Sequence, residues 1–266
     1  MKSITVKNCI FGNWNPKICV PIVGRTKDEI LNHAIQIKLE AERLEAMEEY
    51  AGRRVDVIEF RADFYDDVTS RKHLTELLGN LREVFPERLI LFTYRSEAEG
   101  GEVRNDHAEC RLDDIIECAV DSGNIDLLDI ELFSGNYQVA KRSAKAHENG
   151  VKVILSYHNF KETPTDEFLI KVLTDMEGLG GDLLKFAVTP NCKEDVERIL
   201  NLTKAVTKGE SEAGSIESPV IVISMKELGR ISRISGRETG SAMTFSAVGQ
   251  ESAPGQVGLE EMFRVL

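Results

Sequence analysis

The stretch "GGDLLKFAVTP", residues 180–190, contains a short apolar run, 183–188, between a glycine pair and a proline. Continuous apolar runs of this length are typical of parallel strands that are covered on both faces. An ammonium group, that of Lys185, stands in the middle of the run. The stretch therefore predicts a buried parallel strand, and it raises the question of what a lysine does inside one.

Seven further runs of the same kind occur along the chain, at 18–23, 55–60, 89–94, 127–130, 151–157, 220–225 and 243–248. Segments with helical periodicity alternate with them, at 28–50, 70–85, 108–122, 136–149, 165–179 and 193–208. Gly123, Gly150 and Gly180 stand where helix C-caps are expected. Strands and helices alternating in this way define the α/β class.

Eight strands alternating with helices over 266 residues predict a closed (β/α)8 TIM barrel. We expect one catalytic domain over 1–266, with residues 1–14 forming a β-hairpin that closes the barrel floor. A doubly wound open sheet is the alternative. Such a sheet is expected to carry a glycine-rich phosphate turn after its first strand, and "VPIVGRTKDE" (20–29) does not fit GxGxxG.

Composition argues against several classes of protein. The net charge of −12 disfavours a nucleic-acid partner. No apolar run approaches the roughly 18 residues that span a bilayer, and "MKSITVKNCIFGNW" lacks the features of a signal peptide, so we expect no membrane association and a cytoplasmic location. Five cysteines without a CxxC pair argue against a disulfide framework or a thiolate zinc site.

In a barrel, functional side chains come from the carboxyl ends of the strands and from the loops that follow. In this chain those positions hold Glu59, Arg61, Arg95, Glu99, Glu131, His158, Arg233, Ser252 and Gln256. Arginines and glutamates around a lysine suggest a small-molecule substrate with a carboxylate and several hydroxyls. Arg233 is expected to bind the carboxylate and Glu59 to accept hydroxyl protons. The composition of loop 249–256 suits a mobile lid that supplies Ser252 and Gln256.

Lys185 has two interpretations. A structural lysine would be neutralised by Glu59 or Glu131 inside the barrel. A functional lysine would lose its proton, because burying an unpaired ammonium is costly, and the resulting amine would attack a carbonyl to form a Schiff base. His158, at the end of the preceding strand, would then carry protons, with Glu99 orienting its imidazole.

Six segments occur in an order that resembles the type I 3-dehydroquinate dehydratase family. They are "VIEFRADF" (57–64), "LFTYRSEAEGGE" (91–102), "SYHNF" (156–160), "LLKFAV" (183–188), "MKELGRISR" (225–233) and "ESAPGQ" (251–256). The opening "MKSITVKN" is also similar. The resemblance implies a (β/α)8 homodimer that acts on 3-dehydroquinate in the shikimate route to aromatic amino acids, without metal or organic cofactor.

The resemblance also implies roles for individual residues. Lys185 falls on the imine-forming lysine, His158 on the general acid/base, and Glu99 on the acidic residue that pairs with the histidine. The substrate-binding positions of the family fall on Glu59, Arg61, Arg95, Arg233, Ser252 and Gln256. Pro21 departs from the pattern, because some members have a serine there that contacts substrate, and this puts a hydroxyl contact from the first strand in doubt.

Three other functions are compatible with parts of this pattern. A class I aldolase would also place an imine lysine on a barrel strand, but it would usually need a phosphate site after strands seven and eight. A barrel could bind a hydroxy acid without turning it over. Metal-assisted hydrolysis would need a His/Asp ligand cluster, which the favoured rim does not offer.

Overall fold

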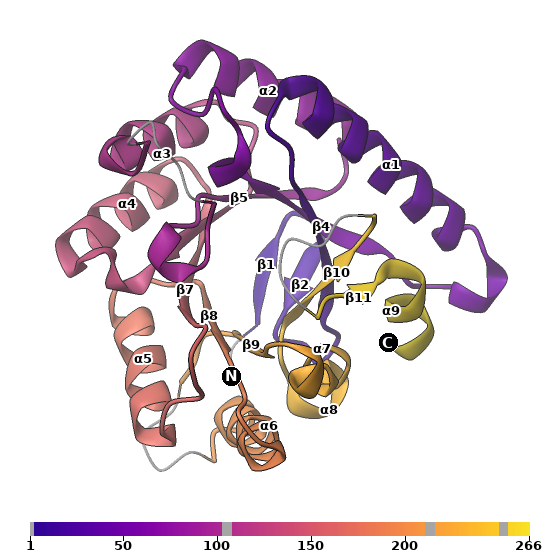
Figure 1. Cartoon of the computed structure of the whole chain (residues 1–266), viewed down its shortest axis with the longest axis vertical. Helices are drawn as coiled ribbons and strands as arrows, with labels where there is room; N and C mark the ends of the chain where they lie inside the picture. Colours follow the sequence, from indigo (N-terminus) through magenta and orange to yellow (C-terminus); the bar gives the residue numbers. More distant parts are fainter. Residues whose placement is uncertain (1–2, 103–107, 211–215, 250–254) are drawn as a thin grey trace.

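The computed structural model describes residues 3–102, 108–210, 216–249 and 255–266. In this part of the chain, eight parallel strands curl into a barrel with helices around its outside (Figure 1). The strands are β3 (Lys17–Ile22), β4 (Val55–Arg61), β5 (Leu89–Thr93), β6 (Leu127–Glu131), β7 (Lys152–Asn159), β8 (Leu183–Val188), β9 (Val220–Ser224) and β10 (Met243–Ala247). They pair in the order β10, then β3 to β9, and the N–H of Ala242 donates to the oxygen of Val220 at 2.8 Å, where β10 meets β9. The predicted (β/α)8 barrel is confirmed.

The six predicted helices are present as α1 (Lys27–Glu45), α2 (Arg71–Val84), α3 (Leu112–Asp121), α4 (Asn136–Glu148), α5 (Asp166–Gly178) and α6 (Lys193–Lys208). The predicted end of the first helix at residue 50 is wrong, because the chain leaves the helix after Glu45 and forms a separate 3-10 turn, η1 (Glu48–Tyr50). Residues 108–111 likewise form a 3-10 turn before α3 rather than its first turn. Gly123, Gly150 and Gly180 follow α3, α4 and α5 with φ of 67°, 75° and 87°, as C-cap glycines do.

Four short elements were not predicted: α7 (Ile231–Ile234), α8 (Gly236–Thr239), α9 (Leu259–Val265) and β11 (Val257–Gly258), which pairs with β10. Elements of two to seven residues carry too little periodicity to be recognised in a sequence. The helical layer after β9 therefore consists of two single turns instead of one long helix.

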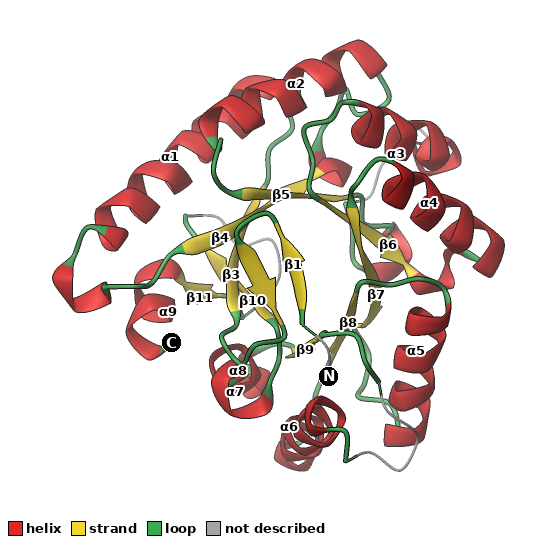
Figure 2. Cartoon of the chain, turned by 180° about the vertical axis from the view of Figure 1, so that it is seen from behind, coloured by secondary structure: helices red, strands yellow, loops and turns green. Residues whose placement is uncertain are grey.

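Two apolar cores lie on the two faces of the sheet. The larger core fills the space between the strands and the helices, and the smaller one fills the barrel interior. The hairpin of β1 (Ile4–Val6) and β2 (Cys9–Phe11) crosses the end of the barrel at which the strands begin (Figure 2). Its Phe11 is fully buried and packs in the inner core with residues such as Leu89 and Leu127. The predicted hairpin at the barrel floor is confirmed.

Aspartates fix the strands at this floor. Asp56, Asp126 and Asp182 lie at or just before the starts of β4, β6 and β8. The carboxylate of each accepts a hydrogen bond from a backbone N–H near the start of the preceding strand, at 3.1, 2.8 and 2.9 Å respectively. A carboxylate bonded to a neighbouring strand holds the register, which decides the face to which every later side chain points. The floor thereby determines which residues reach the interior at the opposite rim.

Candidate active site

A cavity of about 90 Å³ opens at the carboxyl ends of the strands. Its lining includes eight of the nine predicted site residues: Glu59, Arg61, Arg95, Glu99, His158, Lys185, Arg233 and Gln256. The ninth, Ser252, lies outside the described residues. The structure therefore brings together, from six strands or the segments after them, the groups that the sequence placed at one rim.

Strand alternation explains why these side chains point inward. Val57 belongs to the inner core, and Glu59 and Arg61 follow it at intervals of two on β4. In the same way, Ile154 of the inner core precedes His158 on β7, and Leu183 precedes Lys185 on β8. Each strand thus presents apolar residues to the floor and polar residues to the cavity.

Lys185 is buried, with 4% of its surface exposed. Its Nζ lies 3.3 Å from Oδ2 of Asp129 and 4.7 Å from the centroid of the Phe245 ring. The contacting carboxylate is therefore that of Asp129, not that of Glu59 or Glu131, which were the expected partners of a structural lysine. Asp129 precedes Glu131 by two residues on β6 and so shares its inward face. An aspartate inside the apolar run "LLDIE" was the available signal, and sequence reasoning missed it.

Arg95 connects the carboxylates around this lysine. Its Nη2 donates to Oδ1 of Asp129 at 2.8 Å, and its Nη1 donates to Glu131 at 3.1 Å and to Oγ of Ser156 at 3.0 Å. Ser156 in turn donates to Oδ1 of Asp129 at 2.7 Å. Burial alone would raise the pKa of Asp129, but Arg95, Lys185 and Ser156 outweigh it and hold that pKa below its usual value. Asp129 is thus held as a carboxylate.

His158 forms a pair with Glu99. Its Nδ1 lies 2.9 Å from Oε2 of Glu99, and the same oxygen accepts the backbone N–H of His158 at 3.1 Å. Burial, with Arg95, Lys185 and Arg61, lowers the pKa of His158 well below its usual value. Burial raises the pKa of Glu99 to about 8, and Glu131 and Asp129 add to this effect while Arg95 opposes it.

Phe160 covers the imidazole. Its ring stacks on that of His158, with centroids 6.5 Å apart and planes inclined by 20°. Gly100, at the end of the 3-10 turn η3 (Glu97–Glu99), makes room for this ring: its φ is 82°, and a Cβ built there would lie 2.3 Å from a carbon of Phe160. A glycine is therefore required by both the backbone and the close approach.

Two further polar groups of the cavity, Arg61 and Glu59, are held by partners of their own. Arg61 forms a two-pronged ion pair with the fully buried Asp63, at 2.9 and 2.8 Å. Glu59 accepts a hydrogen bond from Thr93 at 2.8 Å. Arg233 reaches the cavity from α7 and is 2% exposed. These contacts fix the positions of charges that a polar substrate would meet.

Pro21 lies in β3 opposite Glu59. The described pairing of β3 with β10 ends at Cys19, two residues before Pro21. The missing N–H of Pro21 therefore removes no hydrogen bond from this pairing. The structure thus accommodates proline where the resemblance suggested a serine.

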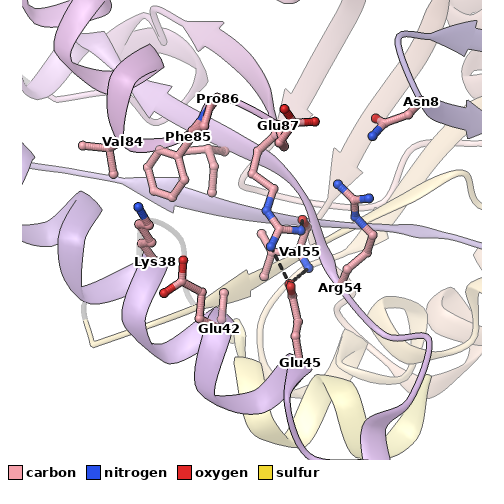
Figure 3. A pocket seen from close by; sticks show the side chains of 13 residues that line it. Asn8, Lys38, Glu42, Glu45, Arg54, Val55, Val84, Phe85, Pro86 and Glu87 are labelled. Carbon is pink, nitrogen blue, oxygen red and sulfur yellow. Dashed lines mark hydrogen bonds and ion pairs between the residues drawn. The ribbon is translucent and has the colours of Figure 1, made fainter.

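A second cavity, of about 430 Å³, lies at the other end of the strands (Figure 3). It is lined by residues from the C-terminal parts of α1 and α2 and from the start of β4. Arg88, one of its lining residues, donates to Glu45 and to the backbone oxygen of Val55, both at 2.6 Å. Because Val55 begins β4 and Arg61 ends it, this cavity is separate from the one that holds Lys185.

Among the described residues, no group of three or more His, Cys, Asp or Glu side chains is placed to hold a metal ion. Nor is any helix in the described ranges long and apolar enough to cross a membrane.

Known proteins are similar to this chain over nearly its whole length. The model of a protein family described as type I 3-dehydroquinase matches residues 18–266. The 3-dehydroquinate dehydratase of Listeria monocytogenes is 40% identical over 100% of this chain and 97% of that protein, and that of Salmonella typhimurium is 36% identical over 100% and 98%. A crystal structure of the type I enzyme from Clostridium difficile with covalently modified comenic acid has a TM-score of 0.86 and 36% identity, covering 99% of this chain and 96% of that one. The chain belongs to the type I 3-dehydroquinase family.

Proposed function

We propose that this protein is a 3-dehydroquinate dehydratase of the shikimate pathway and that its reaction proceeds through a Schiff base on Lys185. One observation carries the proposal: a buried lysine amine and a histidine that is 10% exposed and paired with a glutamate line the same small cavity. A ketone bound there would meet a nucleophile and a proton carrier together. Family membership favours dehydration over the aldol cleavage that the same groups could perform.

The first half of the reaction forms the imine. Lys185 first gives up one proton of its ammonium, and the uncharged amine attacks C3 of 3-dehydroquinate. The carbonyl oxygen takes up a proton through His158 while the nitrogen loses one, which gives a neutral carbinolamine. A second proton leads to loss of that oxygen as water and leaves a protonated imine between Nζ and C3. The positively charged nitrogen withdraws electrons and makes the C2 hydrogen acidic.

The second half eliminates water from the ring. His158 takes the C2 proton, and the electron pair moves to the nitrogen as an enamine forms. The enamine returns this pair to the ring, C1 loses its hydroxyl, and the imidazolium of His158 supplies the proton that makes the leaving group water. Hydrolysis of the product imine releases 3-dehydroshikimate and restores the amine of Lys185.

The charged residues around these two groups bind the substrate. Arg233 pairs with the substrate carboxylate, for which a guanidinium has the matching two-pronged geometry. Glu59 accepts a hydroxyl proton, Arg61 and Gln256 donate to ring oxygens, and Ser252 contributes from the loop. Arg95, whose guanidinium bonds to Asp129 and Glu131, keeps these carboxylates in position as well as lining the cavity.

The test is an ultraviolet assay for the conjugated enone product. Lys185→Ala should lower kcat by more than about 10⁴-fold while weak substrate binding persists, since the nucleophile itself is removed. His158→Ala should lower kcat by about 10²- to 10⁴-fold and leave slow imine formation. Lys171→Ala, which removes an exposed lysine on α5, serves as the control and should retain parental rates. Parental rates in either cavity variant would contradict the assigned roles.

We further propose that the protein works as a homodimer in the cytoplasm, as the family resemblance implies. Sedimentation equilibrium should then give about twice the chain mass of 29.7 kDa. A single species of the chain mass at micromolar concentration would contradict the dimer.

A further inference from the structure

We propose that Asp129 is the counter-ion of the Schiff base: its carboxylate pairs with the amine of Lys185 before the reaction and with the protonated imine after it. This inference rests on the Schiff-base function proposed above. It assigns a catalytic role to a residue whose carboxylate contacts the reacting nitrogen.

The two oxygens of Asp129 have different partners. Oδ1 accepts hydrogen bonds from Ser156 at 2.7 Å and from Arg95 at 2.8 Å, which fix the plane of the carboxylate. Oδ2 faces Nζ of Lys185 at 3.3 Å. The Asp129 side chain is 0% exposed, so water does not screen this contact. One oxygen thus anchors the group while the other is presented to the nitrogen.

The surroundings make such an anion necessary. Arg61, Arg95 and Arg233 line the same cavity, and each would repel a further positive charge on Nζ. A buried cation without a partner is strongly disfavoured. The protonated imine nitrogen is Nζ of Lys185 itself, so the charge remains next to the Asp129 carboxylate.

The charge balance of imine formation supports the assignment. A lysine ammonium and a ketone give a protonated imine and one water molecule, so one positive charge is present on both sides of the equation. The N–C3 bond forms, the C3–O bond breaks, and the oxygen leaves as water. The two protons that this oxygen takes up, the first of them through His158, equal in number the two that the ammonium nitrogen loses. Asp129 therefore faces a cation before imine formation and again after it. The carbinolamine, which lies between these two states, and the enamine, which follows them, are neutral at nitrogen.

Other charged and titratable groups also face Nζ or share its cavity. They are Cys19 on β3, Glu59 and Arg61 on β4, Arg95 and Glu99 after β5, Glu131 on β6, His158 on β7 and Arg233 on α7. The pKa of Asp129 is held below its usual value by Arg95, Lys185 and Ser156, so Asp129 remains a carboxylate beside them. Its charge is therefore constant over the pH range of the test.

The experiment measures how much protonated imine exists at each pH. The enzyme is mixed with 3-dehydroquinate between pH 6 and 9, sodium cyanoborohydride reduces the protonated imine, and mass spectrometry gives the fraction of chains that carry the adduct. With Asp129 in place, the trapped fraction should be constant up to pH 9. Asp129→Asn, which keeps the shape but removes the charge, should move the midpoint of trapping down by about 1 to 3 pH units, the usual effect of losing an opposite charge at this range.

Glu131→Gln is the matched control, because Glu131 lies on the same strand and face and also bonds to Arg95. It should shift the midpoint by less than about 0.5 pH unit, as the carboxylate next to Nζ is unchanged. A midpoint in Asp129→Asn equal to that of the parent overturns the inference. If Asp129→Asn does not fold, the pH dependence of trapping in the parent protein tests the inference. A trapped fraction of the parent that falls by half before pH 7.5 overturns the inference. A parent that forms no adduct at all overturns the proposed function together with the inference.

Discussion

Replacing Glu99 by glutamine keeps the size of the side chain that contacts His158 but removes its ability to ionise. Glu99 Oε2 lies 2.9 Å from Nδ1 of the histidine. The pKa of Glu99 is raised to about 8 by burial, whereas that of His158 is well below 6.5. Because the two groups are in direct contact, they titrate as a pair, and we expect the pair to release one proton near pH 8.

The sign of the pH effect follows from the form that reacts. Below pH 8 the carboxyl of Glu99 holds the proton and donates it to Nδ1, which leaves the hydrogen of the imidazole on Nε2, toward the substrate. Above pH 8 the carboxylate accepts from Nδ1–H, and Nε2 is free to take the C2 proton. A group with this pKa is about 1% deprotonated at pH 6, so kcat/KM should fall about 100-fold from its alkaline plateau to pH 6.

In Glu99→Gln this titration disappears, and kcat/KM should be flat from pH 7 to 9. The plateau should lie about 10- to 100-fold below that of the parent, because the imidazolium formed during the reaction loses a charged hydrogen-bond partner contributing about 1.5–3 kcal/mol. The enone assay at constant ionic strength measures both profiles, with Glu97→Gln on the same turn as the control that keeps the parental profile. An unchanged acidic limb near pH 8 in Glu99→Gln would refute the reasoning.

Three further substitutions, the first with a matched control, test the fold and the cavity walls. Phe11→Ala should lower the free energy of unfolding by about 3–5 kcal/mol in denaturant titrations, whereas Ile10→Ala on the exposed side of the same hairpin should cost less than about 1 kcal/mol; equal losses would contradict the hairpin's place in the core. Asp63→Asn should cost about 3–5 kcal/mol and raise KM, because it leaves Arg61 buried without its carboxylate; an unchanged KM would show that this pair does not shape the cavity. Gly100→Ala should raise KM and lower kcat in steady-state assays by displacing the ring that covers the imidazole, and parental kinetics would disprove that effect.

The strands could be located from the sequence because both their faces are buried. Such strands appear as continuous apolar runs, and the ends of all eight lie within two residues of the predicted ones. The helical layer was harder to predict. The segment after β9 turns twice within nine residues, Ile231–Ile234 and Gly236–Thr239, and tertiary contacts rather than periodicity decide its shape.

For the cavity, the sequence indicated which residues gather at the rim but not how they pair. Lys185 could be placed on an inward face, yet the choice among Glu59, Asp129 and Glu131 as its partner depends on barrel curvature and on the position of Arg95. The pairing of Glu99 with His158 was expected both from their places at the rim and from the family resemblance, and the structure places Oε2 of Glu99 2.9 Å from Nδ1 of His158. A distance between strands is a property of the closed sheet, which local sequence does not encode.

The most direct test of the account is to locate the covalent bond. The protein is quenched with sodium borohydride during turnover of 3-dehydroquinate, digested, and sequenced by mass spectrometry. A Schiff base on Lys185 predicts one reduced adduct, on the peptide that contains Lys185, at near-stoichiometric yield. Continued turnover with no modified peptide, or with the adduct on another lysine, would contradict it.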